Sequence, residues 1–185
     1  MGTTVAPRRR RAAVVRTRPL RRDDPAVDAV FAGLSERSRY LRFHVPVPRL
    51  TAAVRRHLHD VDGRRHAGVV AEVRGVLGAR PVGIGRIVGA AGEPVELAVA
   101  VVDAWHGRGV GRALLTDLGA LARDLGHGKL HGRVLAENAG VVALLRSVFP
   151  GTRHTRDGDV VHVRCPLVDS VEITHEDLLA DLLAC

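Results

Sequence analysis

The first third of the chain carries apolar residues at helical spacing, interrupted by residues that start and stop helices. Aspartate, serine and threonine accept hydrogen bonds from the free amides of a first helical turn, and proline is tolerated there. Proline further along ends a helix. After a short strand over 12–17, the predicted helices are 23–34, opened by Asp-Asp-Pro, 35–43, stopped before Pro46, and 51–59, capped by Thr51.

Beyond Ala67 the apolar residues form short β-branched runs separated by turn residues. Residues 68–73 and 82–88 are predicted strands, and the sequence Gly-Ala-Arg-Pro over 78–81 is expected to be the hairpin turn between them. A second turn over 91–94 leads to a strand over 95–102. The pattern therefore predicts three successive antiparallel strands.

The last third of the chain alternates helices and strands. Residues 111–125 form the clearest helical pattern, with leucines on one stripe and Gly126 as a stop. A strand over 130–135, a helix over 138–148 and strands near Arg153 and over 160–165 follow. The predicted fold class is α/β (α+β): one domain with a mixed, mostly antiparallel sheet of about seven strands, flanked by about four helices, plus a C-terminal helix.

No repeat or low-complexity linker divides the 185 residues. We therefore expect a flexible basic head over 1–11, one domain over 12–166 and a helical tail over 167–185. The tail carries leucines on one face, and an exposed leucine row is a liability. It is expected to dock on the body of the protein or on a second copy, which would make a homodimer.

Charge and composition narrow the classes of partner. The chain has 28 Lys and Arg against 20 Asp and Glu, for a formal charge of +8, and Lys129 is the single lysine. Arginines gather in the head and would attract phosphate backbones, but only 3% of the residues are aromatic and able to stack on bases. Nucleic acid is therefore not expected as a partner, and DNA binding by the head is a weaker hypothesis.

The sequence also argues against membrane, disulfide and metal chemistry. It has no run of about 18 apolar residues and no signal-peptide pattern, so a cytoplasmic protein without a membrane segment is expected. Cys165 and Cys185 are interpreted as free thiols. The histidines and aspartates from His57 to His66 lack metal-site spacing and fit a solvated surface, so no metal is predicted.

Candidate chemistry concentrates where the strand over 95–102 runs through a glycine-rich turn into the helix from 111. Glycine lets the backbone bend and a ligand approach closely. The free amides of a helix start, with two arginines nearby, form an anion site that would accept a pyrophosphate. The segment lacks the lysine of a P-loop, and its Gly-x-Gly-x-Gly spacing differs from the dinucleotide-binding Gly-x-Gly-x-x-Gly.

Two motifs in order resemble those of the GNAT acyl-CoA N-acetyltransferases. The sequence His-Gly-Arg-Gly-Val-Gly over 106–111 resembles the central motif, with His where Gln or Arg is usual, and the overlapping 108–113 also satisfies it. Residues 134–138, Val-Leu-Ala-Glu-Asn, resemble the second motif. The resemblance covers about 12–165 and implies acetyl-CoA as co-substrate. The implied cofactor-binding residues are Val99 and Val101 for the pantetheine arm, Gly107, Arg108, Gly109, Val110, Gly111 and Arg112 for the pyrophosphate, and Asn138 beyond the splayed strands.

Glu96 is the candidate general base. The attacking amine must be neutral, so a carboxylate at the acceptor end is expected to take its proton, directly or through water. The resemblance supports a catalytic Glu near this point, and the alternative is a solvent-facing residue that begins a strand, because alternation alone does not choose the face. Leu145 stands where many family members carry a tyrosine general acid, so no tyrosine mechanism is predicted.

Residues 38–43 look like the early helices of Pat-type bacterial protein-lysine acetyltransferases, which implies acceptor contacts from Tyr40, Arg42 and Phe43. Core packing is the alternative for each of them. The predicted function is acetyl transfer from acetyl-CoA to a primary amine, on a protein lysine or a small molecule, by direct attack in a ternary complex. The alternative, favoured by Leu145, is a catalytically degenerate GNAT domain that binds acyl-CoA as a sensor or interaction module.

Overall fold

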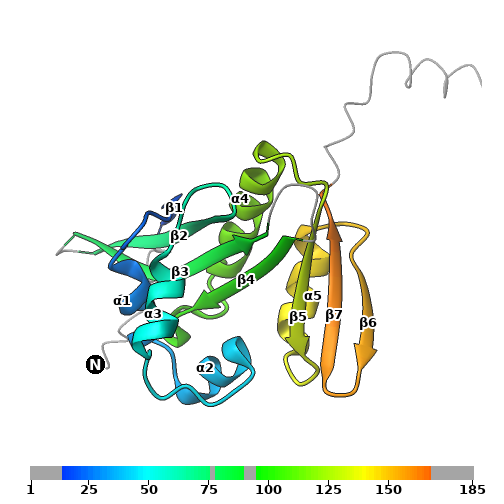
Figure 1. Cartoon of the computed structure of the whole chain (residues 1–185), viewed down its shortest axis with the longest axis horizontal. Helices are drawn as coiled ribbons and strands as arrows, with labels where there is room; N and C mark the ends of the chain where they lie inside the picture. Colours follow the sequence, from blue (N-terminus) through cyan, green and yellow to red (C-terminus); the bar gives the residue numbers. More distant parts are fainter. Residues whose placement is uncertain (1–13, 76–77, 90–94, 168–185) are drawn as a thin grey trace, which may run out of the picture.

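The computed structural model describes residues 14–75, 78–89 and 95–167, which form one seven-stranded sheet with helices on both faces (Figure 1). Across the sheet the strand order is β1-β2-β3-β4-β5-β7-β6, and among the described strands only the β4–β5 pair is parallel. The strands are β1 (Val15–Pro19), β2 (His66–Gly75), β3 (Gly78–Val88), β4 (Val95–Val101), β5 (Lys129–Leu135), β6 (Arg153–Asp157) and β7 (Val160–Pro166).

The helices begin and end at the residues that the sequence marks. Thr51 Oγ1 accepts from the N–H of Val54, which confirms the predicted cap, and Ser35 Oγ caps α2 in the same way by accepting from the N–H of Ser38. Gly126, with φ +82°, follows the end of the long helix, as predicted. The described helices are α1 (Ala26–Ala32), α2 (Glu36–Phe43), α3 (Ala52–His59), the 3-10 helix η1 (Asp103–Trp105), α4 (Val110–Asp124) and α5 (Ala139–Val148).

One predicted turn is wrong. Residues 78–81 belong to β3, which begins at Gly78 and pairs with β2. Pro81 has no N–H to donate, and proline inside a sheet is tolerated at bulges. The β2–β3 register shifts between Ala71 and Glu72, where their partners are Gly83 and Pro81, so one residue of β3 is extra at the proline. The bulge lets the strand continue where the sequence resembles a turn.

Two hydrophobic cores lie on opposite faces of the sheet. The larger one joins the sheet to α4 and α5, and the buried leucines of α4, Leu114, Leu115 and Leu118, lie within it. The smaller one joins the opposite face to α1 and includes Val27 and Val30. The sheet therefore separates a side covered by α4 and α5 from a side covered by the early helices.

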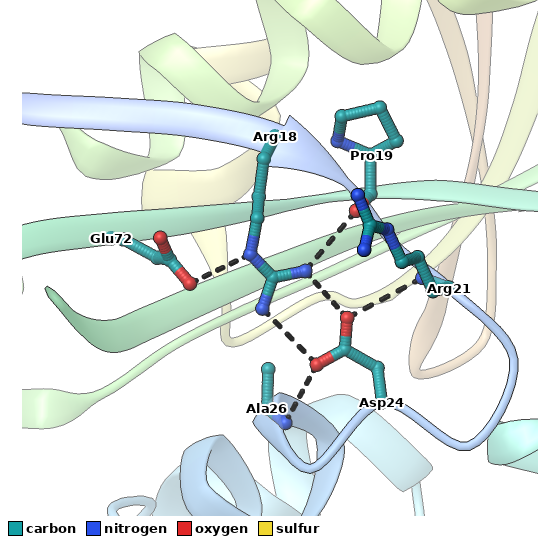
Figure 2. A network of polar contacts seen from close by, with 6 residues as sticks. All are labelled: Arg18, Pro19, Arg21, Asp24, Ala26 and Glu72. Atoms are coloured by element: carbon teal, nitrogen blue, oxygen red, sulfur yellow. Dashed lines mark hydrogen bonds and ion pairs between the residues drawn. The ribbon is translucent and has the colours of Figure 1, made fainter.

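A polar network fixes the junction between β1 and α1 (Figure 2). Arg18 pairs with both Asp24 and Glu72, and Asp24 also accepts from the N–H of Ala26 at 3.0 Å. Burial of Asp24 opposes its ionisation, but the hydrogen bonds from Arg18 and Ala26 hold its pKa below the ordinary value. The aspartate predicted to open this helix does so as part of an ion-paired network.

Several predictions fall on other parts of the chain. The head over 1–11, the turn over 91–94, and the tail beyond Leu167 with Cys185 lie outside the described residues. Cys165 is a buried free thiol whose pKa is raised by burial. No helix within the described ranges is long and apolar enough to cross a membrane.

Candidate active site

The strands β4 and β5 pair at one end and then diverge (Figure 1). Val95 pairs with Leu130 and Glu96 pairs with His131, and no further β4–β5 pair occurs among the described residues. On its other side, β4 stays paired with β3 as far as Val101. The part of β4 from Leu97 onward is therefore an open edge inside the sheet.

The alternation of the backbone directs the polar groups of Val99 and Val101 into this opening. The N–H of Val102 donates to Val82 O of β3 at 2.9 Å, and successive residues of a strand point their backbone groups to opposite sides. The N–H groups of Val99 and Val101 therefore point away from β3. The carbonyl oxygen of Val101 accepts from His106 Nε2 at 2.8 Å, which leaves its N–H as the free group.

The glycine turn lies directly after this edge. Gly107 (φ +67°) and Gly109 (φ +81°) adopt left-handed backbone conformations that favour glycine, and a Cβ on either would meet no atom within 4 Å. Gly109 caps α4, whose first-turn N–H groups have no acceptor inside the helix. Arg108 lies over the ring of Trp105, at 5.0 Å from its centroid. The turn therefore combines free donors, positive charge and open space.

The later residues of the motif have structural roles as well. A Cβ on Gly111 would lie 2.9 Å from Leu144 Cδ2 of α5, so this glycine lets α4 and α5 pack closely. Arg112 donates to Ser147 Oγ of α5 at 3.1 Å. Val110 is fully buried in the larger core, so it offers only its backbone to a ligand.

Asn138 lies across the opening from β4. It precedes α5, is half-buried, and its side chain does not cap the helix. Leu145, on the same helix, is 0% exposed within the larger core. The position that holds tyrosine in many GNAT proteins is thus a packing position in this chain and supplies no acid.

The helix α2 spans the diverging ends of β4 and β5. On the β4 side, Asp103 accepts from Ser35 N, Ser35 Oγ and Ser38 Oγ. On the β5 side, Arg37 pairs with Glu137 at 2.7 Å. Burial opposes the ionisation of Asp103, but its serine partners lower its pKa below the ordinary value, so it accepts as a carboxylate. These contacts hold the predicted acceptor residues of α2 at the opening.

Glu96 is exposed, and it lies on the face of the sheet that carries the early helices. Alternation places its side chain on the same side as Ala98 and Ala100, and Ala100 packs against the smaller core. Its charge acts on Arg42 and on His44, the residue that ends α2. Burial lowers the pKa of His44, the charges of Arg133 and Arg42 lower it further, and Glu96 opposes them. The candidate base thus lies on the same face of the sheet as the predicted acceptor residues of α2.

Of the three predicted acceptor residues, Arg42 and Phe43 line a cavity between the sheet, α1 and α2. Tyr40 is half-buried and is not part of that lining. The ring of Phe43 packs edge-on against Phe31 of α1, with centroids 6.1 Å apart. Core packing and access to the cavity therefore coexist at Phe43.

The sequence interpretation missed Asp103 and Arg86. Asp103 follows an apolar strand with no local signal, because its serine partners lie far away in the sequence. Arg86 lies within the apolar run 82–88 and is 4% exposed in the same cavity. A lone arginine inside a run of strand-forming apolar residues is the signal that would have found it.

No family model matches the chain, and no curated protein matches it. Among solved structures, the GNAT domain of S. lividans PAT is similar at 27% identity, over 82% of this chain and 90% of that domain, with a TM-score of 0.72. The chain has the GNAT fold.

Other GNAT structures are similar in fold at lower identity. A variant of the cAMP-binding acyltransferase from Mycobacterium smegmatis matches at 24% identity over 91% of this chain, with a TM-score of 0.58, and this chain spans 49% of that protein. The spermidine N-acetyltransferase from Vibrio cholerae, in complex with CoA and spermine, matches at 15% identity over 83% of this chain and 95% of that one, with a TM-score of 0.63. The GNAT resemblance and the fold class predicted from the sequence are confirmed.

Proposed function

We propose that the chain is an acetyl-CoA-dependent N-acetyltransferase that acetylates a primary amine, on a small molecule or a protein lysine, by direct attack in a ternary complex. The observation that carries the proposal is the open edge of β4 next to the glycine turn. The N–H groups of Val99 and Val101 and those of the first turn of α4 are free donors on one path. In acetyl-CoA the pantetheine amides precede the pyrophosphate, so the molecule needs hydrogen-bond donors in the same order, first along β4 and then at the start of α4.

The residues around the opening suit both ends of such a cofactor. Val99 and Val101 would hold the pantetheine arm, as an added strand does. Residues 107–112 would hold the pyrophosphate through backbone N–H groups, with Arg108 supplying charge. Asn138, on the β5 side, would contact the arm beyond the divergence. Bound acetyl-CoA supplies the thioester carbonyl that the amine attacks.

Glu96 is proposed to act as general base. It accepts a proton from the amine, directly or through water, as the new C–N bond forms and the C–S bond breaks. The departing thiolate takes its proton from solvent, because Leu145 has no acidic proton to donate, and a thiol with a pKa of about 8.5 is a good leaving group without one. The same leucine favours the alternative that the domain binds acyl-CoA without turnover, as a sensor or interaction module.

The substitution Glu96→Gln tests this assignment. It should lower kcat/KM for amine acetylation by about 10²- to 10⁴-fold, since it removes the base but keeps the shape of the side chain. Acetyl-CoA affinity should stay within about twofold. Asp157→Asn, which removes one exposed carboxylate on the distant strand β6, is the matched control and should leave the rate unchanged.

Two results would contradict different parts of this proposal. Equal rates for the parent and Glu96→Gln would remove Glu96 from the mechanism. Tight acetyl-CoA binding by the parent, without acetylation of any amine in a broad screen, would favour the sensor.

A further inference from the structure

A cavity of about 40 Å³ lies between the sheet and the early helices, on the face that carries Glu96. Its walls are mostly apolar and come from α1, α2, α3, β3 and β4, with Val30, Phe31, Leu58, Ile84 and Ala98 among them. Two arginines, Arg42 and Arg86, also line it. An apolar cavity with two guanidinium groups and no lining carboxylate calls for an anionic occupant.

Arg86 is the more deeply buried of the two, with 4% of its surface exposed. Its Nη2 donates to the backbone oxygen of His57 at 3.2 Å, whereas its Nε is buried and has no partner within the described residues. It forms no ion pair with any carboxylate of residues 14–75, 78–89 or 95–167. Burial lowers the pKa of Arg86, and the charge of Asp60 opposes this only in part. Burying a charge without an ion-pair partner is strongly unfavourable, so buried arginines are rare unless an anion pairs with the guanidinium.

Arg42 adds a second positive charge at the same cavity. It is half-buried, and its guanidinium lies 5.1 Å from the centroid of the Phe43 ring. It too has no carboxylate within ion-pair distance in the described part of the chain. Burial and the nearby charge of Arg86 lower its pKa to about 10, and Glu96 opposes them. An anion between the two guanidinium groups would relieve both the burial and the repulsion.

The volume limits which anion fits. A buried water needs roughly 10–15 Å³ of cavity volume, so this cavity of about 40 Å³ holds a group of two to four heavy atoms. A carboxylate has three heavy atoms, whereas a phosphate ester or a nucleotide is larger. A carboxylate also accepts two parallel N–H donors from arginine, which gives it direction as well as charge.

We propose that this cavity binds the carboxylate of the amine acceptor, so that the substrate is a small amino acid carrying both a free amine and a free carboxylate. The inference rests on the proposed acetyltransferase function. Ala98, which lines the cavity and pairs with Arg86 across β3 and β4, lies two residues from Glu96 on the same face. That spacing is about 7 Å along a strand, a distance that a small molecule and the flanking side chains can span.

The test compares acceptors that differ only in the carboxylate. Free amino acids, α and ω, are assayed with acetyl-CoA beside their amides and their decarboxylated amines. Amides have less basic amines and decarboxylated amines have more basic ones, so a preference over both cannot come from amine basicity. We expect kcat/KM to be about 10- to 100-fold higher for the acid.

Arg86→Met and Arg42→Met should each reduce that preference to within about twofold. Arg39→Met, on α2 but outside the cavity lining, is the matched control and should keep it. Replacing an unpaired buried charge by an apolar side chain is often neutral or stabilising, so Arg86→Met should fold with an unchanged or higher Tm. If Arg86→Met does not fold, Arg42→Met decides.

A second measurement separates this inference from the proposed function. Thermal unfolding is followed with the free amino acid and without any CoA. The amino acid should raise the Tm of the parent and of Arg39→Met, but not that of Arg86→Met. If the acid fails to stabilise the parent, or stabilises Arg86→Met equally, the cavity is not a carboxylate site, whatever the enzyme does with acetyl-CoA. Equal acetylation of acids and amides, or acetylation of a lysine peptide that Arg86→Met leaves unchanged, would also overturn the inference.

Discussion

The side chain of Asp24 has three hydrogen-bond partners and is only 3% exposed. It pairs with the Arg18 guanidinium and accepts backbone N–H groups from Arg21 and Ala26. Arg18 in turn reaches Glu72 on β2, and Figure 2 shows the chain of contacts from one strand to the next and to the helix. The charge of Asp24 therefore ties the start of α1 to the edge of the sheet.

Asp24→Asn should lower the free energy of unfolding by about 2 kcal/mol at pH 7, because it leaves a partly buried guanidinium with one carboxylate fewer. The pKa of Asp24 is lowered in the folded state, so its contribution is complete above the ordinary pKa of aspartate and is lost as the pH falls below it. The difference between parent and variant should thus shrink below about pH 4. Urea unfolding of parent and variant at pH 7 and at pH 3 measures this difference in stability.

The neighbouring Asp23 provides a control for charge alone. It is exposed, with φ +55°, a conformation that asparagine tolerates well. Asp23→Asn should leave stability within about 0.5 kcal/mol of the parent. A stability loss for Asp24→Asn that is the same at pH 3 and pH 7 would contradict the role given to its charge.

Local signals predicted some site residues and not others. Ser35 and Thr51 were predictable as caps because a cap interacts with an amide three residues away. The face occupied by Glu96 was not predictable, because it depends on which helices cover the sheet. Arg86 and Arg42 meet only after β3 and α2 come together, so neither sequence neighbourhood contains the cavity that they share.

At the scale of elements, the edge of β4 is the feature on which cofactor binding depends. Along β4, the backbone N–H groups of alternate residues bond to β3, and those of the residues between them point into the opening. The two classes can be separated by substitution, because proline removes one N–H and adds a ring at the same place.

Val99→Pro should weaken acetyl-CoA binding at least tenfold while the protein stays folded, since the lost N–H is not part of the ladder with β3. Ala98→Pro is the matched variant: its N–H points toward β3, so it should destabilise the sheet. Circular dichroism melts and calorimetric titration measure the two effects. Unchanged affinity in Val99→Pro would mean that this edge does not hold the cofactor.

The elements themselves were largely predictable, and the exceptions have physical causes. The helix α4 and the strands β4, β5 and β7 follow from periodicity within one or two residues. The turn expected at 78–81 failed because Pro81 is accommodated by a bulge, which depends on the partner strand. The divergence of β4 and β5 also escapes local patterns, since it results from pairing between segments more than thirty residues apart.

At the scale of the whole molecule, the sheet separates the proposed cofactor site from the proposed acceptor site. The opening between β4 and β5 lies beside α4 and α5, whereas Glu96 and the arginine-lined cavity lie on the face of the early helices. A cofactor at the opening and an acceptor in the cavity would approach Glu96 from opposite sides of the sheet. This arrangement suits direct attack, because both reactants are bound at once.

The proposed acetyl-CoA site is tested most directly by calorimetric titration of the parent, Gly109→Glu and Gly109→Ala with acetyl-CoA. Both substitutions place a side chain at φ +81°, but only glutamate puts bulk and negative charge into the open space beside the first turn of α4. We expect micromolar binding by the parent, a small loss of affinity for Gly109→Ala and no measurable binding for Gly109→Glu. A parent that does not bind acetyl-CoA, or a Gly109→Glu protein that binds it as tightly as Gly109→Ala, would contradict the proposed site.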